Sequence, residues 1–368
     1  MFNRPVFRSV LLSALATLLP FAAQAEDERV VNVYNWSDYI AEDTLERFTE
    51  ETGIKVNYDV YDSNEIVEAK LMAGNSGYDV VFPSIVPNAA RGIAAGLYQA
   101  LDRAQLPNWD NIEPGVLKAL AANDPGNEHA VPYMMAPTAY GVNKAKIAEL
   151  APDAPLDSWA VLFEPEWLEM LQGCGVTWLD DPSEVIAAAQ AYLGNDPTTA
   201  ETAKVEEAAA LLEKGRPYLK YIHSSSYIND LANGDICVAH GYGGDLIQAR
   251  DRAVEADKGV EIEIVLPTEG VNAVIDVMAI PADAPHVEEA HAFINFMLRP
   301  DVVGPITNEV GYTNAIKGSD EFVTEERLND PIIYPSAETR EKFFTVPVRS
   351  SSYLRSETRI WTRIKTGK

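Results

Sequence analysis

The sequence lacks the short motifs that mark common catalytic centres. Its five histidines are dispersed, and none belongs to a His-Glu-x-x-His pair of the kind that binds zinc. It has no Cys-x-x-Cys pair, no phosphate-binding glycine loop and no Gly-x-Ser-x-Gly turn around a nucleophilic serine. We therefore expect no catalytic residues, no cofactor and no metal site. A hydrolase with its catalytic residues scattered along the chain is the alternative.

Long apolar segments are scarce as well. One runs from Val10 to Leu19, after the positive charges of Arg4 and Arg8 and before a small-x-small sequence that ends at Ala25. This run is about half of the roughly 20 residues needed to cross a bilayer, so the pattern predicts a secretory signal peptide, residues 1–25. A retained membrane anchor is the alternative. No Cys follows the expected cleavage after Ala25 to carry a lipid, and we expect a soluble periplasmic protein.

Basic residues are few relative to acidic ones. There are 29 Lys and Arg against 56 Asp and Glu, and the net charge is −27. Removal of a signal peptide with two Arg and no acid would change the charge to −29. Such a surface repels nucleic acid and anionic lipid, so neither is an expected partner. The charge is compatible with a cationic ligand, but many exported proteins are acidic and charge alone identifies no ligand.

Cysteine is nearly absent, with Cys174 and Cys237 the two in the chain. In an oxidising compartment an even count favours one disulfide. It would close a loop of about 64 residues and contribute roughly 4 kcal/mol in the chain-entropy model. Two buried free thiols are the alternative.

After the signal peptide, strand and helix patterns alternate. The patterns predict strands at 30–34, 54–58 and 78–82, and helices at 43–52 and 65–72. Asp43 is placed to cap the first helix, and Gly53 to end it. The alternation predicts a mostly parallel sheet covered by helices. The 343 residues after the signal peptide are enough for two domains of ordinary size.

Polar and aromatic residues follow two of these strands. In mostly parallel sheets, ligands bind at the carboxyl ends of the strands. Trp36, Ser37, Asp38 and Tyr39 lie in the loop after the first strand, and Ser84 follows the third. This combination of rings, a carboxylate and hydroxyls indicates a binding site. A helix-entry loop with a structural Trp is the alternative.

Two further acids have informative surroundings. Asp276 lies inside an apolar strand expected at 273–280, where an unpaired carboxylate is costly. It is therefore the most informative single acid in the chain. Asp245 follows the glycine-rich segment 241–244 and is expected to begin a helix. A role as helix N-cap is a sufficient explanation for Asp245 taken alone.

The chain resembles the periplasmic polyamine-binding proteins, the putrescine and spermidine receptors of ABC importers, over essentially all of its mature length. The segments that carry the resemblance are, in order, 35–39 (NWSDY), 76–79 (SGYD), 106–109 (LPNW), 159–166, 227–239 (YINDLANGDICVA), 280–284 (IPADA) and 361–365 (WTRIK). Each is weak alone. Seven in the right order are specific for the family, although not for one ligand.

The resemblance implies the type II solute-binding fold, in which two α/β lobes, each a mostly parallel sheet flanked by helices, close on a ligand. We expect residues 26–134 and 253–322 to form one lobe and residues 135–252 and 323–368 the other, with a crossing at 133–137. The implied partners are a small cationic ligand, such as putrescine, spermidine or a related amine, and an inner-membrane ABC permease. The protein is expected to be a monomer and not an enzyme.

The resemblance also implies a set of ligand-binding residues. Buried ammonium groups require carboxylates and other acceptors, and the methylene groups between them require apolar cover. Aromatic faces supply this cover and a cation–π attraction of about 0.5–2 kcal/mol. By position, the rings are Trp36, Tyr39 and Tyr242, the carboxylates are Asp38, Glu184, Asp245 and Asp276, and the polar contacts are Ser37, Ser84, Ser224 and Tyr312.

Three departures from the family pattern leave the exact ligand open. Val274 stands where an aromatic residue is usual, Met135 replaces a Trp, and segment 85–87 lacks the usual polar and aromatic residues. The result is a more aliphatic, adaptable surface. A receptor for another cation, such as a guanidino or acylated amine, is therefore the nearest alternative, and a sensor that presents its ligand to a membrane receptor is another.

Asp181 lies three residues before Glu184, a spacing that resembles the spermidine-binding branch of the family. We include Asp181 among the expected ligand-binding residues, because an additional acid there would meet a second or third amine. The alternative is a helix cap, with Pro182 at the first helical position.

Overall fold

In the computed structural model the described residues are 1–2 and 29–367. The cleavage site predicted after Ala25, and nearly all of the predicted signal peptide, lie outside them. Among the described residues, no helix combines the length and the apolar content needed to cross a bilayer.

Strands and helices alternate at the start of the described chain, as the sequence predicts. The strands are β1 (Val30–Trp36), β2 (Lys55–Tyr61), β3 (Val80–Val81), β4 (Ala130–Asn143), β5 (Val176–Trp178), β6 (Tyr221–Ile222), β7 (Val238–Tyr242), β8 (Ile262–Val265), β9 (Val271–Ala279), β10 (Thr313–Asn314) and β11 (Phe343–Phe344). The helices are α1 (Thr44–Thr52), α2 (Asn64–Met72), α3 (Ala90–Ala94), α4 (Pro114–Leu120), α5 (Lys144–Leu150), α6 (Ala160–Phe163), α7 (Pro165–Leu171), α8 (Pro182–Tyr192), α9 (Thr202–Gly215), α10 (Tyr227–Ala232), α11 (Gly243–Ala256), α12 (Val287–Met297), α13 (Pro300–Val310), α14 (Glu325–Leu328), α15 (Ala337–Arg340) and α16 (Ser351–Thr366).

Local sequence signals account for several element ends. Gly53 ends α1 because it adopts the left-handed conformation, with φ of 70°, and donates its backbone N–H to the carbonyl of Thr49. The Ser63 Oγ accepts from the backbone N–H of Ile66 and caps α2. Asp43 was expected to cap α1 but makes no side-chain cap bond, because its own backbone is already helical where a cap residue is usually extended.

The sheet is mixed. Its main strand order is β2-β1-β3-β9-β4-β7-β5-β6. Pairing is parallel towards the two ends, between β1 and its neighbours β2 and β3 and between β5 and its neighbours β6 and β7. It is antiparallel in the middle, where β4 lies between β9 and β7. Within this main order the expected parallel pairing is confined to the ends, because β4 and β9 pass through the centre in opposite directions. Outside it, β11 pairs with β9 in parallel.

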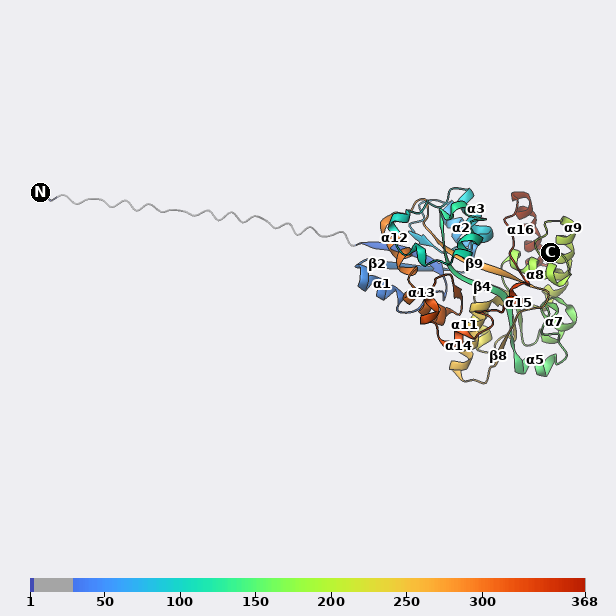
Figure 1. The fold of residues 1–368 in the computed structure, drawn as a ribbon. Coiled ribbons are helices and arrows are strands. Elements are labelled where there is room, and N and C mark those ends of the chain that lie inside the picture. The colour runs from blue at the N-terminus through green and yellow to red at the C-terminus, as the bar shows by residue number, and fades with distance from the viewer. Residues whose placement is uncertain (3–28, 368) are drawn as a thin grey trace.

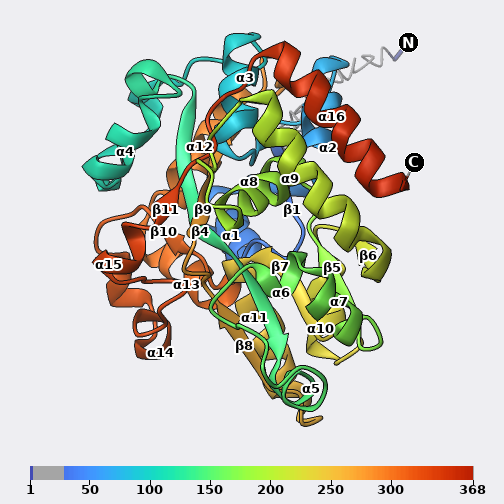
Figure 2. The same cartoon turned by 90° about the vertical axis from the view of Figure 1, so that its right-hand side faces the viewer.

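Apolar side chains form two large clusters, one on each side of this centre. The same two strands contribute to both, since Val131 and Met278 lie in the first cluster and Tyr140 and Val271 in the second. Figure 1 shows β4 and β9 between two groups of helices. The C-terminal helix α16 packs on α8 and α9 in the second group (Figure 2). The fold is a two-lobed α/β fold in which β4 and β9 are crossing segments.

The residue limits of the lobes stay a prediction. The first cluster draws on residues between 31 and 136 and between 278 and 316, and the second on residues between 139 and 271 and between 360 and 364. β8 pairs with β4 and contributes Ile262 and Val265 to the second cluster, although it lies in the range 253–322 that we expect in the first lobe.

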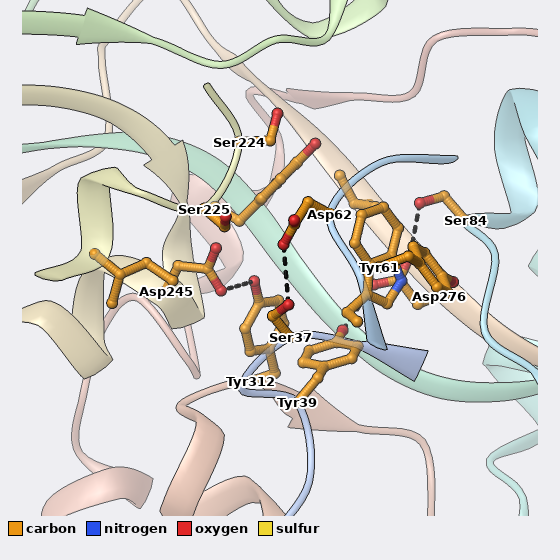
Figure 3. A pocket seen from close by; sticks show the side chains of 14 residues that line it. Ser37, Tyr39, Tyr61, Asp62, Ser84, Ser224, Ser225, Asp245, Asp276 and Tyr312 are labelled. Atoms are coloured by element: carbon orange, nitrogen blue, oxygen red, sulfur yellow. Dashed lines mark hydrogen bonds between the residues drawn. The ribbon is translucent and has the colours of Figure 1, made fainter. Parts of the chain in front are cut away.

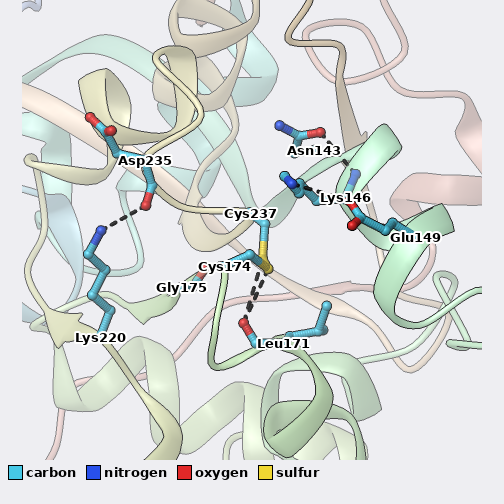
Figure 4. Close-up of a disulfide and its surroundings, with 9 residues drawn as sticks. All are labelled: Asn143, Lys146, Glu149, Leu171, Cys174, Gly175, Lys220, Asp235 and Cys237. Atoms are coloured by element: carbon cyan, nitrogen blue, oxygen red, sulfur yellow. Dashed lines mark hydrogen bonds and ion pairs between the residues drawn. A yellow bond between two sulfur atoms is a disulfide. The ribbon is translucent and has the colours of Figure 1, made fainter.

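Cys174 and Cys237 form the disulfide expected from the sequence (Figure 4). Their Cα atoms are 5.5 Å apart. Cys174 follows α7 and Cys237 precedes β7, and the backbone N–H of Cys237 donates to the carbonyl of Gly175 at 2.9 Å. The bridge therefore ties the end of a helix to a strand of the second lobe.

Loss of this disulfide is expected to destabilise the protein. The bridged residues are 63 positions apart, so the Cys174→Ala/Cys237→Ala variant should lose roughly 4 kcal/mol of unfolding free energy in the chain-entropy model. Urea unfolding of the oxidised wild type and of the variant measures the difference. An unchanged unfolding midpoint, or full reaction of the native cysteines with a thiol reagent, would contradict the assignment.

Candidate functional site

A cavity of about 500 Å³, including its opening to solvent, lies where the two lobes meet. It is bordered by the carboxyl ends of β1 and β2, the loop after β3, the crossing strand β9, and the starts of α10 and α11 (Figure 3). The lining residues are Trp36, Ser37, Tyr39, Tyr61, Asp62, Ser84, Ser224, Ser225, Ile228, Tyr242, Asp245, Val274, Asp276 and Tyr312.

Asp276 is held in the cavity wall by two hydroxyl groups. It lies on β9 and is 7% exposed. Its Oδ2 accepts a hydrogen bond from the Tyr39 hydroxyl at 2.7 Å, and its Oδ1 accepts one from the Ser84 Oγ at 2.7 Å. Burial raises the pKa of Asp276 to about 6, even though both hydroxyls act to lower it. These bonds explain how an apolar strand tolerates a carboxylate, and they leave its charge without a protein cation.

Asp245 is held in the same way, by one tyrosine from each lobe. Its Oδ2 accepts from the Tyr227 hydroxyl at 2.7 Å, and its Oδ1 accepts from the Tyr312 hydroxyl at 2.8 Å. Burial raises the pKa of Asp245 to about 6, against the effect of these two bonds. The sequence suggested an N-cap, but Tyr242 holds that position and Asp245 lies in the first turn of α11. Its side chain lines the cavity.

Gly244 permits the Tyr312 ring to reach Asp245. A Cβ atom at position 244 would lie 1.9 Å from two ring carbons of Tyr312, far inside any real contact. A glycine is therefore required where α11 passes the ring. This close approach fixes a contact between the two lobes at the cavity wall.

Aromatic rings form much of the remaining wall. The Trp36 indole N–H donates to the carbonyl of Phe82 at 2.6 Å, and its ring lies 4.6 Å from that of Tyr61. The Tyr39 ring meets the Tyr312 ring edge to face at 4.7 Å. The cavity thus combines carboxylates with fixed apolar surfaces, an arrangement that binds a cation with a hydrocarbon body.

Most of the predicted site residues line this cavity. They are Trp36, Ser37, Tyr39, Ser84, Ser224, Tyr242, Asp245, Asp276 and Tyr312. Asp38, Asp181 and Glu184 do not.

Asp38 is exposed and pairs with Arg252 at 3.1 Å. Its backbone is left-handed, with φ of 54°, which turns the residue away from the neighbouring wall positions. Asp181 is the N-cap of α8, where its Oδ1 accepts from the backbone N–H groups of Ser183 and Glu184. The cap role that the sequence left open for Asp181 is therefore present, and a contact between Asp181 and a ligand stays a prediction.

Glu184 is buried close to the cavity without lining it. Its Oε1 accepts from the Asn272 side-chain amide at 2.5 Å, and its Oε2 has no partner among the described residues. Burial raises the pKa of Glu184 to about 7, with a smaller contribution from the charge of Asp276. The pKa of the neighbouring Asp181 is also raised well above its usual value, again chiefly by burial.

Sequence reasoning did not select Tyr61, Asp62, Ser225 and Ile228, which also line the cavity. Tyr61 and Asp62 lie at the carboxyl end of β2, and the Tyr61 hydroxyl donates to the Phe82 carbonyl at 2.6 Å. The rule that ligands bind at strand ends, applied to the first and third strands, would have found these two residues if applied to the second. Among residues 29–367, no group of His, Cys, Asp or Glu is arranged to hold a metal ion.

Comparison with known proteins gives a consistent set of relatives. Residues 43–333 match the family described as bacterial extracellular solute-binding protein. A putrescine-binding periplasmic protein of Pseudomonas aeruginosa is 49% identical over 364 residues, 98% of each chain. A putrescine-binding periplasmic protein of Escherichia coli is 49% identical over 346 residues, 94% of this chain and 93% of that one.

A solved structure extends the comparison to the fold. The substrate-binding protein of a spermidine/putrescine ABC transporter from Streptococcus pneumoniae superposes with a TM-score of 0.74 at 26% identity. The superposition covers 92% of this chain and 99% of that one.

The buried Asp276 carboxylate predicts a pH dependence of stability. Its folded-state pKa of about 6 is above the usual 3.8, so the folded protein retains a proton that the unfolded chain releases. The stability due to this proton is present below about pH 4 and is lost as the pH rises through 6. Between pH 4 and pH 7, ligand-free wild type should lose roughly 2–3 kcal/mol more than Asp276→Asn.

Urea unfolding of both proteins at several pH values measures this difference. The Asn side chain keeps the shape of Asp276 but carries no ionisable group. Parallel pH profiles for the two proteins would show that burial does not raise the pKa of Asp276.

Proposed function

The chain belongs to the family of bacterial extracellular solute-binding proteins, and from this premise we propose that it captures a polyamine of the putrescine and spermidine class. Proteins of this family bind solutes, and the chain is a binding protein and not an enzyme. The observation that carries the proposal is the cavity itself, in which the carboxylates of Asp245 and Asp276 meet aromatic walls. The names of the two relatives at 49% identity support the same ligand class.

The chemistry of the cavity matches that of a polyamine. An ammonium group beside Asp276 would compensate the charge that burial disfavours, and a second ammonium would do the same at Asp245. Hydroxyl groups already orient both carboxylates, so these side chains lose little conformational entropy when the ligand binds. The methylene groups between the amines would lie against Trp36 and the neighbouring tyrosines, which exclude water from them.

We place this capture in the periplasm and propose that the liganded protein, as a monomer, delivers the amine to an inner-membrane ABC permease. The family and the periplasmic relatives support this location and role. A sensor would use the same cavity and differ only in its membrane partner. A neighbouring permease gene and amine uptake that depends on the protein would favour import.

Another cationic ligand is the second candidate. Val274 lines the cavity and gives an aliphatic patch in a wall that is otherwise rich in rings. Such a patch would suit the plane of a guanidino group or the acyl end of an acylated amine.

A thermal-shift screen separates these candidates. Protein stripped of bound ligand is tested with diamines, triamines, guanidines, acylated amines and neutral amino acids. A ligand present at 100 times its dissociation constant adds about 2.7 kcal/mol of stability. The proposal requires the largest shifts with putrescine or spermidine, and it fails if neither of them stabilises the protein.

Truncation of Asp276 should be the most damaging single change to binding. In Asp276→Ala, an ammonium would lose its carboxylate in a desolvated site, which costs about 2–5 kcal/mol of binding free energy. Isothermal titration calorimetry with putrescine and spermidine measures the loss. The matched control is Asp59→Asn, which removes an acid that lies on β2 outside the lining of the cavity. Wild-type affinity for every amine in Asp276→Ala would refute a cationic ligand.

Trp36→Ala should act differently from Asp276→Ala. It removes apolar cover from the hydrocarbon that all polyamines share, so putrescine and spermidine should weaken by similar factors, about tenfold or more. The same titrations measure both ratios. A loss confined to one amine would show that Trp36 contacts a feature that the two ligands do not share.

A further inference from the structure

A second hollow lies against the two crossing strands, apart from the cavity described above. Its volume is about 700 Å³, including its opening to solvent. Short strands border it, since β10 pairs with β4 and β11 pairs with β9 (Figure 2). We call this hollow the crossing groove, and its lining includes Met135, Ala273, Ile275, Ile333, Arg340 and Phe343.

The crossing groove and the cavity lie on different faces of β9. Successive side chains of a strand point to opposite faces, so Ala273 and Ile275 in the groove point away from Asp276 in the cavity. Val274, between them, borders both hollows. A molecule in the groove would therefore bind outside the cavity, against the strands that connect the lobes.

The lining of the groove is apolar apart from one charge, that of Arg340. None of the lining residues is Asp or Glu, although acids outnumber bases by 56 to 29 in the chain. Arg340 is exposed, and no acid in the part of the chain that the structure describes forms an ion pair with it. Its neighbours along the chain, Glu338 and Glu341, lie outside the lining. The groove therefore presents an unpaired cation beside apolar surface.

This combination defines the chemistry of a ligand. A guanidinium group matches a carboxylate in shape and donates two parallel hydrogen bonds to it. One cation balances one negative charge, which favours a monoanion. The apolar side chains of Met135, Ile333 and Phe343 would cover a hydrocarbon body, and the free energy of that contact grows with the apolar area removed from water.

We propose that the crossing groove is a second binding site, for a small monocarboxylate with an apolar body, such as a straight-chain alkanoate. The carboxylate pairs with Arg340, and the hydrocarbon lies along β4 and β9. Met135 and Val274, two of the departures from the family pattern, both lie in the lining. Side chains smaller than the aromatic residues usual at these two positions leave room for this ligand. The inference is independent of the ligand in the cavity.

Isothermal titration calorimetry of wild type with hexanoate and octanoate tests the apolar contact. Each methylene group that is buried tightens binding about fourfold. Octanoate, with two more methylene groups, should therefore bind about tenfold more tightly than hexanoate.

Variants test the two parts of the groove separately. Arg340→Gln removes the charge and should weaken octanoate about fivefold or more. The matched control is Arg355→Gln, which removes an exposed Arg on α16 outside the groove and should leave octanoate binding unchanged. Met135→Trp adds bulk to the groove and should also weaken octanoate. Thermal unfolding shows whether each variant is folded, and if Met135→Trp is not, the two Arg variants decide alone.

Three results would each overturn the proposal: no binding of octanoate to wild type, equal affinities for hexanoate and octanoate, or equal losses in Arg340→Gln and Arg355→Gln. Titration of the same proteins with putrescine tests the proposed function separately, because Arg340 and Met135 lie outside the lining of the cavity. Octanoate binding without amine binding would refute the proposed function and leave the groove assignment in place.

Discussion

The rest of the site depends on one electrostatic constraint, the burial of carboxylates without a protein cation. Asp276 is 7% exposed on a crossing strand, and hydroxyl groups are its hydrogen-bond partners. Hydroxyls orient a carboxylate and lower the cost of its charge, but they do not neutralise it. The pKa values of Asp276 and Asp245 are raised because burial disfavours these uncompensated charges. A positively charged ligand supplies the missing cation, so the buried carboxylates favour a cationic ligand.

The two-lobed fold supplies the geometry for this constraint. β4 and β9 cross between the lobes, and Asp276 on β9 therefore lies where the loops of both lobes meet. Asp245 accepts hydrogen bonds from Tyr227 in the second lobe and Tyr312 in the first. These two bonds already join the lobes beside the cavity, and a ligand enclosed between the lobes would be shielded from water.

Much of the site could be predicted from the sequence where a residue conflicts with its local pattern. Asp276 is a carboxylate inside an apolar strand. The loop after β1 contains Trp36 and Tyr39, residues that are unsuited to a simple turn. Asp62 was missed because the rule that ligands bind at the carboxyl ends of strands was not applied to β2. The Arg252 partner of Asp38 lies more than two hundred positions away in the sequence, and no local pattern reports such a pair.

The centre of the fold was also less predictable than its ends. Strand–helix alternation predicts parallel pairing, which is present at both ends of the sheet. The antiparallel crossing of β4 and β9 brings together residues more than a hundred positions apart, and its direction depends on the packing of two lobes. The disulfide between Cys174 and Cys237 could be favoured from the count of cysteines and the compartment, but only their positions in the fold decide it.

Proton release on binding tests the electrostatic account most directly. Ligand-free protein is titrated calorimetrically with putrescine at pH 6 in buffers of different ionisation enthalpy. At this pH, carboxylates with pKa values of about 6 are half protonated, whereas the amines, with pKa values near that of Lys, are fully charged. The account predicts a net release of roughly one proton per ligand. Binding without proton release, or with proton uptake, would contradict it.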